Sequence, residues 1–116
     1  MRIFSLVLLL FSSFSNANTP KCDLPTSWAA NMAYVYLTNN NIFSKSEVLH
    51  DNTVVVRMAS EIVDSDVYRQ IHHITFTLKS GRKIAVITSN EASSEECSLG
   101  AVDVFLIERV FSDPSA

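Results

Sequence analysis

Four stretches of the chain alternate apolar with polar residues and are rich in β-branched and aromatic side chains, which is the pattern of strands in a sheet. They cover residues 52–63, 68–79, 82–89 and 101–111. The intervals between them are short, so consecutive strands are expected to pair as neighbours. Ser80 and Gly81, between the second and third stretches, form a tight-turn signal. The sequence therefore predicts a four-stranded antiparallel meander.

One helix is expected before the strands, over residues 27–38. Thr26 or Ser27 can cap its start, and the asparagines at 39–41 can end it because asparagine tolerates the left-handed conformation. The apolar residues of this helix recur at spacings of three and four: Trp28, Met32, Val35 and Tyr36. A helix lying across one face of the meander gives an α+β architecture. This predicted layout resembles the general cystatin-like or inhibitor-type layout, and no motif that identifies a family is present.

Both faces of the predicted sheet are apolar, although a sheet with water on one side should alternate apolar with polar residues. The face expected to pack on the helix holds Val54, Val56, Met58, Ile62, Ile74, Phe76, Leu78, Ile84, Val86, Val102, Val104, Leu106 and Val110. The second face holds Val55, Ile71, Ala85, Ile87, Phe105, Ile107 and Phe111. One short helix cannot cover both faces. Either residues 42–49 and the chain ends fold over the second face, or it is an interface for a second copy or a protein partner.

The first 17 residues read as a signal peptide. A basic residue, Arg2, precedes the apolar run 3–11, and the small side chains of Ser15 and Ala17 suit cleavage after residue 17. The run is shorter than the ~20 residues that a membrane-spanning helix needs. We therefore expect a single α+β domain over residues 18–116 in the periplasm or secreted, with no membrane span.

Export decides the chemistry of the two cysteines, Cys22 and Cys97, because disulfides form and persist outside the cytoplasm. A catalytic thiolate would be disfavoured by the negative charge of Glu95 and Glu96 beside Cys97. A zinc site would need further ligands at suitable spacing, and this segment supplies none. The sequence predicts one Cys22–Cys97 disulfide that ties the start of the helix to the loop before the last strand.

No catalytic, cofactor or metal site is predicted. The adjacent histidines His72 and His73 point to opposite faces of a strand and are expected on half-exposed surface. Asp64 and Asp66 suit a turn, and the chain has only two glycines, too few for a phosphate-binding loop. A domain of this size also leaves little room for a deep pocket. The enzymatic alternative is a small exported hydrolase that uses His72 or His73 with Asp64, Asp66 or Glu61.

The balance of charge argues against nucleic-acid binding, because without Arg2 eight basic residues face 12 acidic ones. The acidic residues Glu91, Glu95 and Glu96 gather in the loop that carries Cys97, and such a loop suits a basic protein partner. The expected contact surface is therefore this loop and the last strand: Glu91, Glu95, Glu96, Phe105, Ile107 and Phe111. The function that fits is an immunity protein or inhibitor that blocks a cell-wall-degrading toxin or hydrolase. A dimeric accessory protein of the envelope is the structural alternative.

Overall fold

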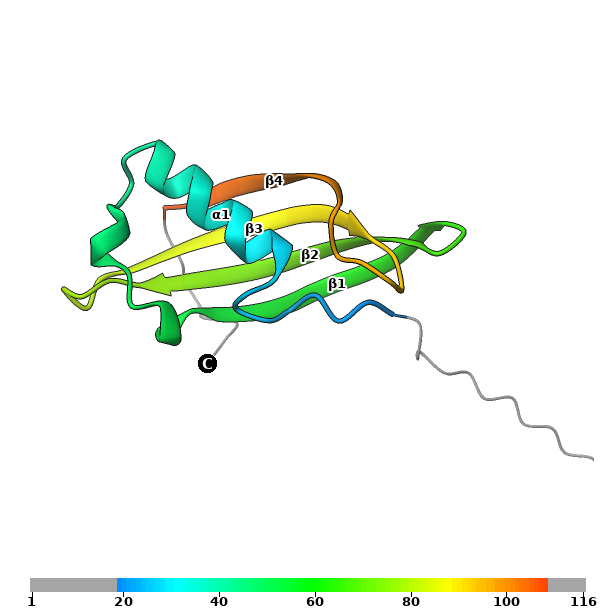
Figure 1. The fold of residues 1–116 in the computed structure, drawn as a ribbon, viewed down its shortest axis with the longest axis horizontal. Coiled ribbons are helices and arrows are strands. Elements are labelled where there is room, and N and C mark those ends of the chain that lie inside the picture. Colours follow the sequence, from blue (N-terminus) through cyan, green and yellow to red (C-terminus); the bar gives the residue numbers. More distant parts are fainter. Residues whose placement is uncertain (1–18, 109–116) are drawn as a thin grey trace, which may run out of the picture.

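The computed structural model describes residues 19–108 and places one helix on a four-stranded antiparallel sheet (Figure 1). Helix α1 spans Trp28–Asn39, and the strands are β1 (Val54–Asp64), β2 (Val67–Thr77), β3 (Lys83–Ala92) and β4 (Leu99–Ile107). Two short 3-10 helices, η2 (Lys45–Glu47) and η3 (His50–Asn52), lead from α1 to β1. The strand order β1-β2-β3-β4 confirms the predicted meander and the α+β fold. The expected signal peptide at residues 1–17 lies outside the described residues.

The signals read from the sequence set the ends of α1. Ser27 is the N-cap, and its Oγ accepts a hydrogen bond from the backbone N–H of Ala30 at 3.4 Å. At the other end Asn40 is the C-cap and Asn41 has φ 61°, the left-handed conformation that asparagine tolerates. The glycine turn is also as expected, since Gly81 has φ 91° and donates to the carbonyl of Leu78 at 2.8 Å.

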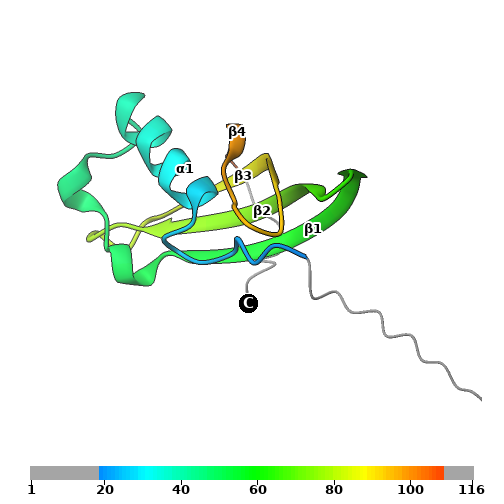
Figure 2. The same ribbon diagram turned by 45° about the vertical axis from the view of Figure 1, so that its right-hand side comes forward.

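The buried face of α1 differs from the one that the apolar spacing predicts. The fully buried residues are small ones, Ala29, Ala30 and Ala33, together with Leu37. Of the expected residues, Trp28 and Met32 pack at the margin of the core, while Val35 and Tyr36 are exposed. Alanines let the helix axis approach the sheet closely. Figure 2 shows α1 on one face of the sheet, where it contacts β3 and β4, and Trp28 Nε1 donates to the carbonyl of Gly100 at 3.1 Å.

The core lies between α1 and the face of the sheet that carries Ile74, Phe76, Ile84, Val86 and Val102, as predicted. The prediction for β1 is wrong at Val54 and Val56. Val54 and Val56 pair with Thr75 and His73 and so lie on the opposite face, whereas Val55 pairs with Ile74 and packs against the core. A register irregularity between Arg57 and Ala59 leaves Met58 exposed and exchanges the faces of the rest of the strand. Ile62 pairs with Tyr68 and so lies on the helix-side face, as predicted, but it is exposed there.

Residues 42–49 do not cover the second face. Phe43 and Val48 are buried in the core on the helix side, where the rings of Phe43 and Phe76 lie 5.6 Å apart and Val48 bridges to Leu78. Within residues 19–108, no helix is packed on the second face (Figure 2). None of the helices in this range is long and apolar enough to cross a membrane.

Candidate functional site

The acidic loop between β3 and β4 (residues 93–98) is bonded to the β1–β2 turn at the same end of the sheet. The backbone N–H of Ser94 donates to Oδ1 of Asp66 at 3.1 Å, and the Ser94 hydroxyl donates to Oδ2 at 2.9 Å. Asp66 itself has φ 51°, and Asp64 Oδ1 accepts from the N–H of Ser65 at 2.7 Å. The expected turn at Asp64–Asp66 is therefore present. The carboxylate of Asp66 also accepts hydrogen bonds from Ser94, which is 28 residues away in the acidic loop. The sequence did not indicate this contact.

Three further connections restrain the acidic loop. The Cys22–Cys97 disulfide is formed, as predicted, across a sequence separation of 75. The side-chain amide of Asn90 donates to the carbonyl of Cys97 at 2.9 Å. Within the loop, the Ser93 hydroxyl accepts from the N–H groups of Glu95 and Glu96 at 3.2 and 3.1 Å. The two glutamates are thus exposed on a backbone that is fixed at several points.

Glu91 is not part of this loop. It lies in β3, on the second face, and its carboxylate forms an ion pair with Arg69 at 3.1 Å. An acidic group with a partner on the neighbouring strand contributes less to a negative surface than a free one does. Glu95 and Glu96 therefore carry the exposed charge of the loop.

The second face has an apolar half and a polar half along β3 and β4. Ile87 pairs with Phe105 and Ala85 pairs with Ile107 in the apolar half. Phe105 is 58% exposed, and Ile107 is half-buried. Towards the acidic loop the same face continues with Ser89, Asp103 and Glu91. The structure thus brings Phe105 and Ile107 onto one face, one end of which leads to the acidic loop. Phe111 lies outside the described residues.

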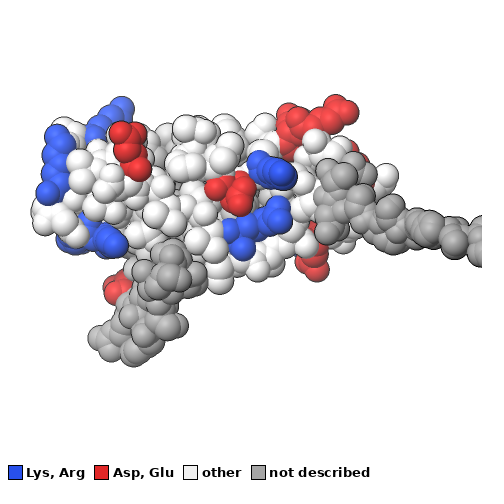
Figure 3. Space-filling model, turned by 90° about the horizontal axis from the view of Figure 1, so that it is seen from below, with Lys and Arg blue, Asp and Glu red and all other residues white. Residues whose placement is uncertain are grey.

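Charge is separated along the length of the domain. The β2–β3 turn carries Lys79, Arg82 and Lys83, and Lys45 of η2 lies beside this turn because the N–H of Lys79 donates to the carbonyl of Glu47. The opposite end carries the acidic loop and the β1–β2 turn with their carboxylates. Figure 3 shows a cluster of basic side chains at one end with some acidic ones beside it, side chains of both signs in the middle, and acidic side chains towards the other end. Such a separation orients a charged partner during approach.

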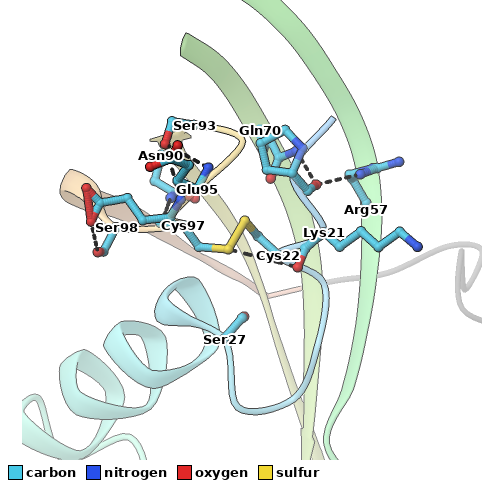
Figure 4. The surroundings of a disulfide bond; sticks show 12 residues. Lys21, Cys22, Ser27, Arg57, Gln70, Asn90, Ser93, Glu95, Cys97 and Ser98 are labelled. Atoms are coloured by element: carbon cyan, nitrogen blue, oxygen red, sulfur yellow. Dashed lines mark hydrogen bonds between the residues drawn. A yellow bond between two sulfur atoms is a disulfide. The ribbon is translucent and has the colours of Figure 1, made fainter. Parts of the chain in front are cut away.

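The N-terminal strap (residues 19–23) lies over the helix-side face of β1 and β2. The carbonyl of Pro20 accepts from Arg57 Nη1 at 2.9 Å and from Gln70 Nε2 at 3.0 Å, and Figure 4 shows both side chains directed at the strap. Cys22 is 1% exposed and joins the strap to Cys97. The strap, the sheet and the acidic loop are therefore one connected unit.

Beneath the strap lies a polar layer of four side chains on neighbouring strands. Gln70 is opposite Asn90 and His72 is opposite Thr88, and all four are at most 5% exposed. Five of their polar atoms have no hydrogen-bond partner among residues 19–108: Gln70 Oε1, His72 Nδ1 and Nε2, Thr88 Oγ1 and Asn90 Oδ1. Burying such atoms without partners costs roughly 1–3 kcal/mol each.

The two histidines occupy opposite faces, as expected, but neither is half-exposed. His72 is 0% exposed and His73 is 4% exposed, and none of the described residues forms a hydrogen bond with either ring. Desolvation lowers the pKa of His72 below its ordinary value of 6.5; nearby Asp23 opposes this shift and Arg57 adds to it. The charged form of His72 is therefore disfavoured in the folded protein.

The carboxylates of the proposed hydrolase set lie along the sheet from the histidines: Glu61 is opposite Arg69, three residues or about 10 Å from His72 and four residues or about 13 Å from His73. His72 pairs with Arg57 and Thr88, whereas Asp64 and Asp66 lie at the β1–β2 turn, at least five residues or about 17 Å along the strand. Within residues 19–108 no three His, Cys, Asp or Glu side chains are grouped as metal ligands.

Open hollows lie on the surface of residues 19–108, and one of them is formed between α1, η3 and β2. It measures about 400 Å³ and is lined by Tyr34, His50, Asp51, Thr53 and Phe76 among others. The rings of Tyr34 and His50 lie 5.0 Å apart.

Comparison with known proteins gives no match: no family model, curated protein or solved structure corresponds to this chain.

Proposed function

We propose that this protein is a small exported binding protein that blocks another protein. Its target is a cell-wall-degrading toxin or hydrolase with a basic surface, and the protein acts as an immunity protein or inhibitor. The observation that carries the proposal is the acidic loop, which is held by a disulfide and by Asp66 at the polar end of a sheet face whose other half, with Phe105 and Ile107, is apolar. The disulfide is compatible with an exported protein.

The acidic loop is held in place before any partner binds. A loop that is already fixed loses little conformational entropy when a partner binds. Exposed carboxylates at Glu95 and Glu96 attract a basic partner and raise the rate of encounter. The exposed ring of Phe105 supplies apolar area for a short-range contact. We therefore assign attraction of the partner to Glu95 and Glu96, and the apolar contact in the complex to Phe105.

Charge reversal in the loop tests the steering part of the proposal. We expect Glu95→Lys to slow association with the basic partner by roughly tenfold at low salt and to flatten the salt dependence of that rate, because exposed charge acts mainly on encounter. Asp51→Lys is the matched control: it makes the same change in net charge on exposed η3. Stopped-flow or biosensor association rates measure both variants. Equal slowing by both would show that only net charge matters and would contradict a docking role for the loop.

A second candidate, self-association through the second face, is favoured by the exposure of Phe105 and Val54. Both residues lie on that face, and within residues 19–108 no helix covers them. Sedimentation of the mature protein over a range of concentrations separates the two functions. A monomer at all concentrations would exclude the dimer and leave the partner proposal standing.

A further inference from the structure

We propose that the N-terminal strap is a pH-sensitive latch, closed over His72 while the imidazole is neutral and released when His72 takes up a proton. The proposal concerns regulation and goes beyond the binding function. His72 is fully buried, its neighbours on the same face bind the strap, and neither ring nitrogen has a partner in the described chain.

The contacts that hold the strap surround His72. Arg57 is the cross-strand partner of His72 and donates to the Pro20 carbonyl, and Gln70, two residues away on the same face, donates to the same oxygen. Arg57 from β1 and Asp23 from the strap are the charged groups that act on His72. On the β3 side its neighbour is the uncharged Thr88. A proton on His72 would therefore be buried beside a guanidinium, with only Asp23 to offset it.

The sign of the pH effect follows from the two states of the strap. With the strap closed, burial lowers the pKa of His72 below 6.5; with the strap open, water restores the ordinary value. The open state therefore binds the proton more tightly. Well above pH 6.5 His72 is neutral in both states and the equilibrium does not change. Below pH 6.5 opening becomes easier by up to about tenfold for each pH unit, until the closed state also takes up the proton.

Opening of the strap would also affect the acidic loop. The strap is joined to Cys97, whose carbonyl accepts from Asn90, a member of the polar layer. The disulfide stays intact when the strap opens, but it then ties the loop to a segment that has lost its hydrogen bonds to Arg57 and Gln70 of the sheet. If the loop docks a partner, a consequence that rests on the proposed function, acid weakens that docking. An exported protein experiences the pH of the surroundings, so the latch would make binding responsive to it.

The side-chain amide of Gln70 reports directly on the latch, because it is fully buried and donates to Pro20 and to Ser60 Oγ at 3.0 Å. Its exchange with water, measured by NMR relative to the exposed side-chain amide of Asn39, gives a protection factor at each pH. We expect this factor to be constant from pH 8 to 6.5 and to fall by up to about tenfold per unit below that. The backbone amide of Val86 in the core reports global unfolding in the same spectra.

Two variants decide the cause. In His72→Phe, which keeps a ring but cannot titrate, the protection of Gln70 should not depend on pH. His73→Phe, on the same strand but the opposite face, should behave like the unaltered protein. If His72→Phe does not fold, the proton titration of His72 itself must have its midpoint where the protection of Gln70 falls. A constant protection factor, the same fall in His72→Phe, or a fall that parallels Val86 would each overturn the latch.

Discussion

Replacing both cysteines by alanine is expected to lower the free energy of unfolding by about 4 kcal/mol. The Cys22–Cys97 bond closes a loop with a sequence separation of 75. In the chain-entropy model such a link lowers the conformational entropy of the unfolded chain, which stabilises the folded state by about 4 kcal/mol. Small domains have free energies of unfolding of roughly 5–15 kcal/mol. The variant should therefore be close to unfolding at ordinary temperature. Urea denaturation followed by the fluorescence of Trp28 measures the difference.

The control for this change is Ser98→Ala, which alters an exposed neighbour of Cys97 without touching the disulfide. Its free energy of unfolding should stay within about 0.5 kcal/mol of the original. A loss below about 1 kcal/mol in the double cysteine variant would mean that the hydrogen bonds of Pro20 and Asn90 hold the strap and loop by themselves. The disulfide would then not be the main restraint on the acidic loop.

Phe105→Glu is expected to weaken binding of the partner by about 30-fold or more. A buried aromatic residue at the centre of an interface typically contributes 2 kcal/mol or more, and a carboxylate in its place would be buried without a counter-charge. The fold should tolerate the change because Phe105 is 58% exposed in the free protein. Titration calorimetry gives the affinity and thermal denaturation gives the stability.

The matched control is Val35→Glu, which places the same charge on an exposed apolar position of α1, away from the second face. It should leave the affinity within about twofold. If Phe105→Glu instead unfolds the domain, the second face is core and not a contact surface. If both variants bind as well as the original, the contact lies elsewhere.

The sheet could be predicted from the sequence because alternation and turn residues are local signals. The side chains of β1 that face the core could not be predicted in this way. Val54, Val55 and Val56 are three consecutive apolar residues, so the sequence does not show alternation between the two faces. Their faces are set by pairing with β2, and the irregularity at Arg57–Ala59 changes them again. The helix was placed correctly but its buried face was not, because alanines carry a weak hydrophobic signal even where close packing requires them.

The disulfide of the candidate site was predicted correctly from the sequence. The role of Glu95 and Glu96 as contact residues stays a prediction. The bond between Asp66 and Ser94 joins residues 28 apart and has no local signal. The polar layer did have a local signal. Gln70 and His72 alternate along β2 with Ile74 and Phe76 and so lie on the same, buried face of the strand, from which their burial could have been predicted.

Capture from an envelope extract tests the central claim most directly. The immobilised mature protein should retain a basic cell-wall hydrolase or toxin and inhibit its lytic activity, and the double charge reversal Glu95→Lys with Glu96→Lys should lose both. The pair Asp51→Lys with Glu47→Lys, exposed acidic residues away from the loop, should keep both. Equal retention by the two double variants, or a retained protein whose activity is unchanged, would contradict a blocking function for the acidic loop.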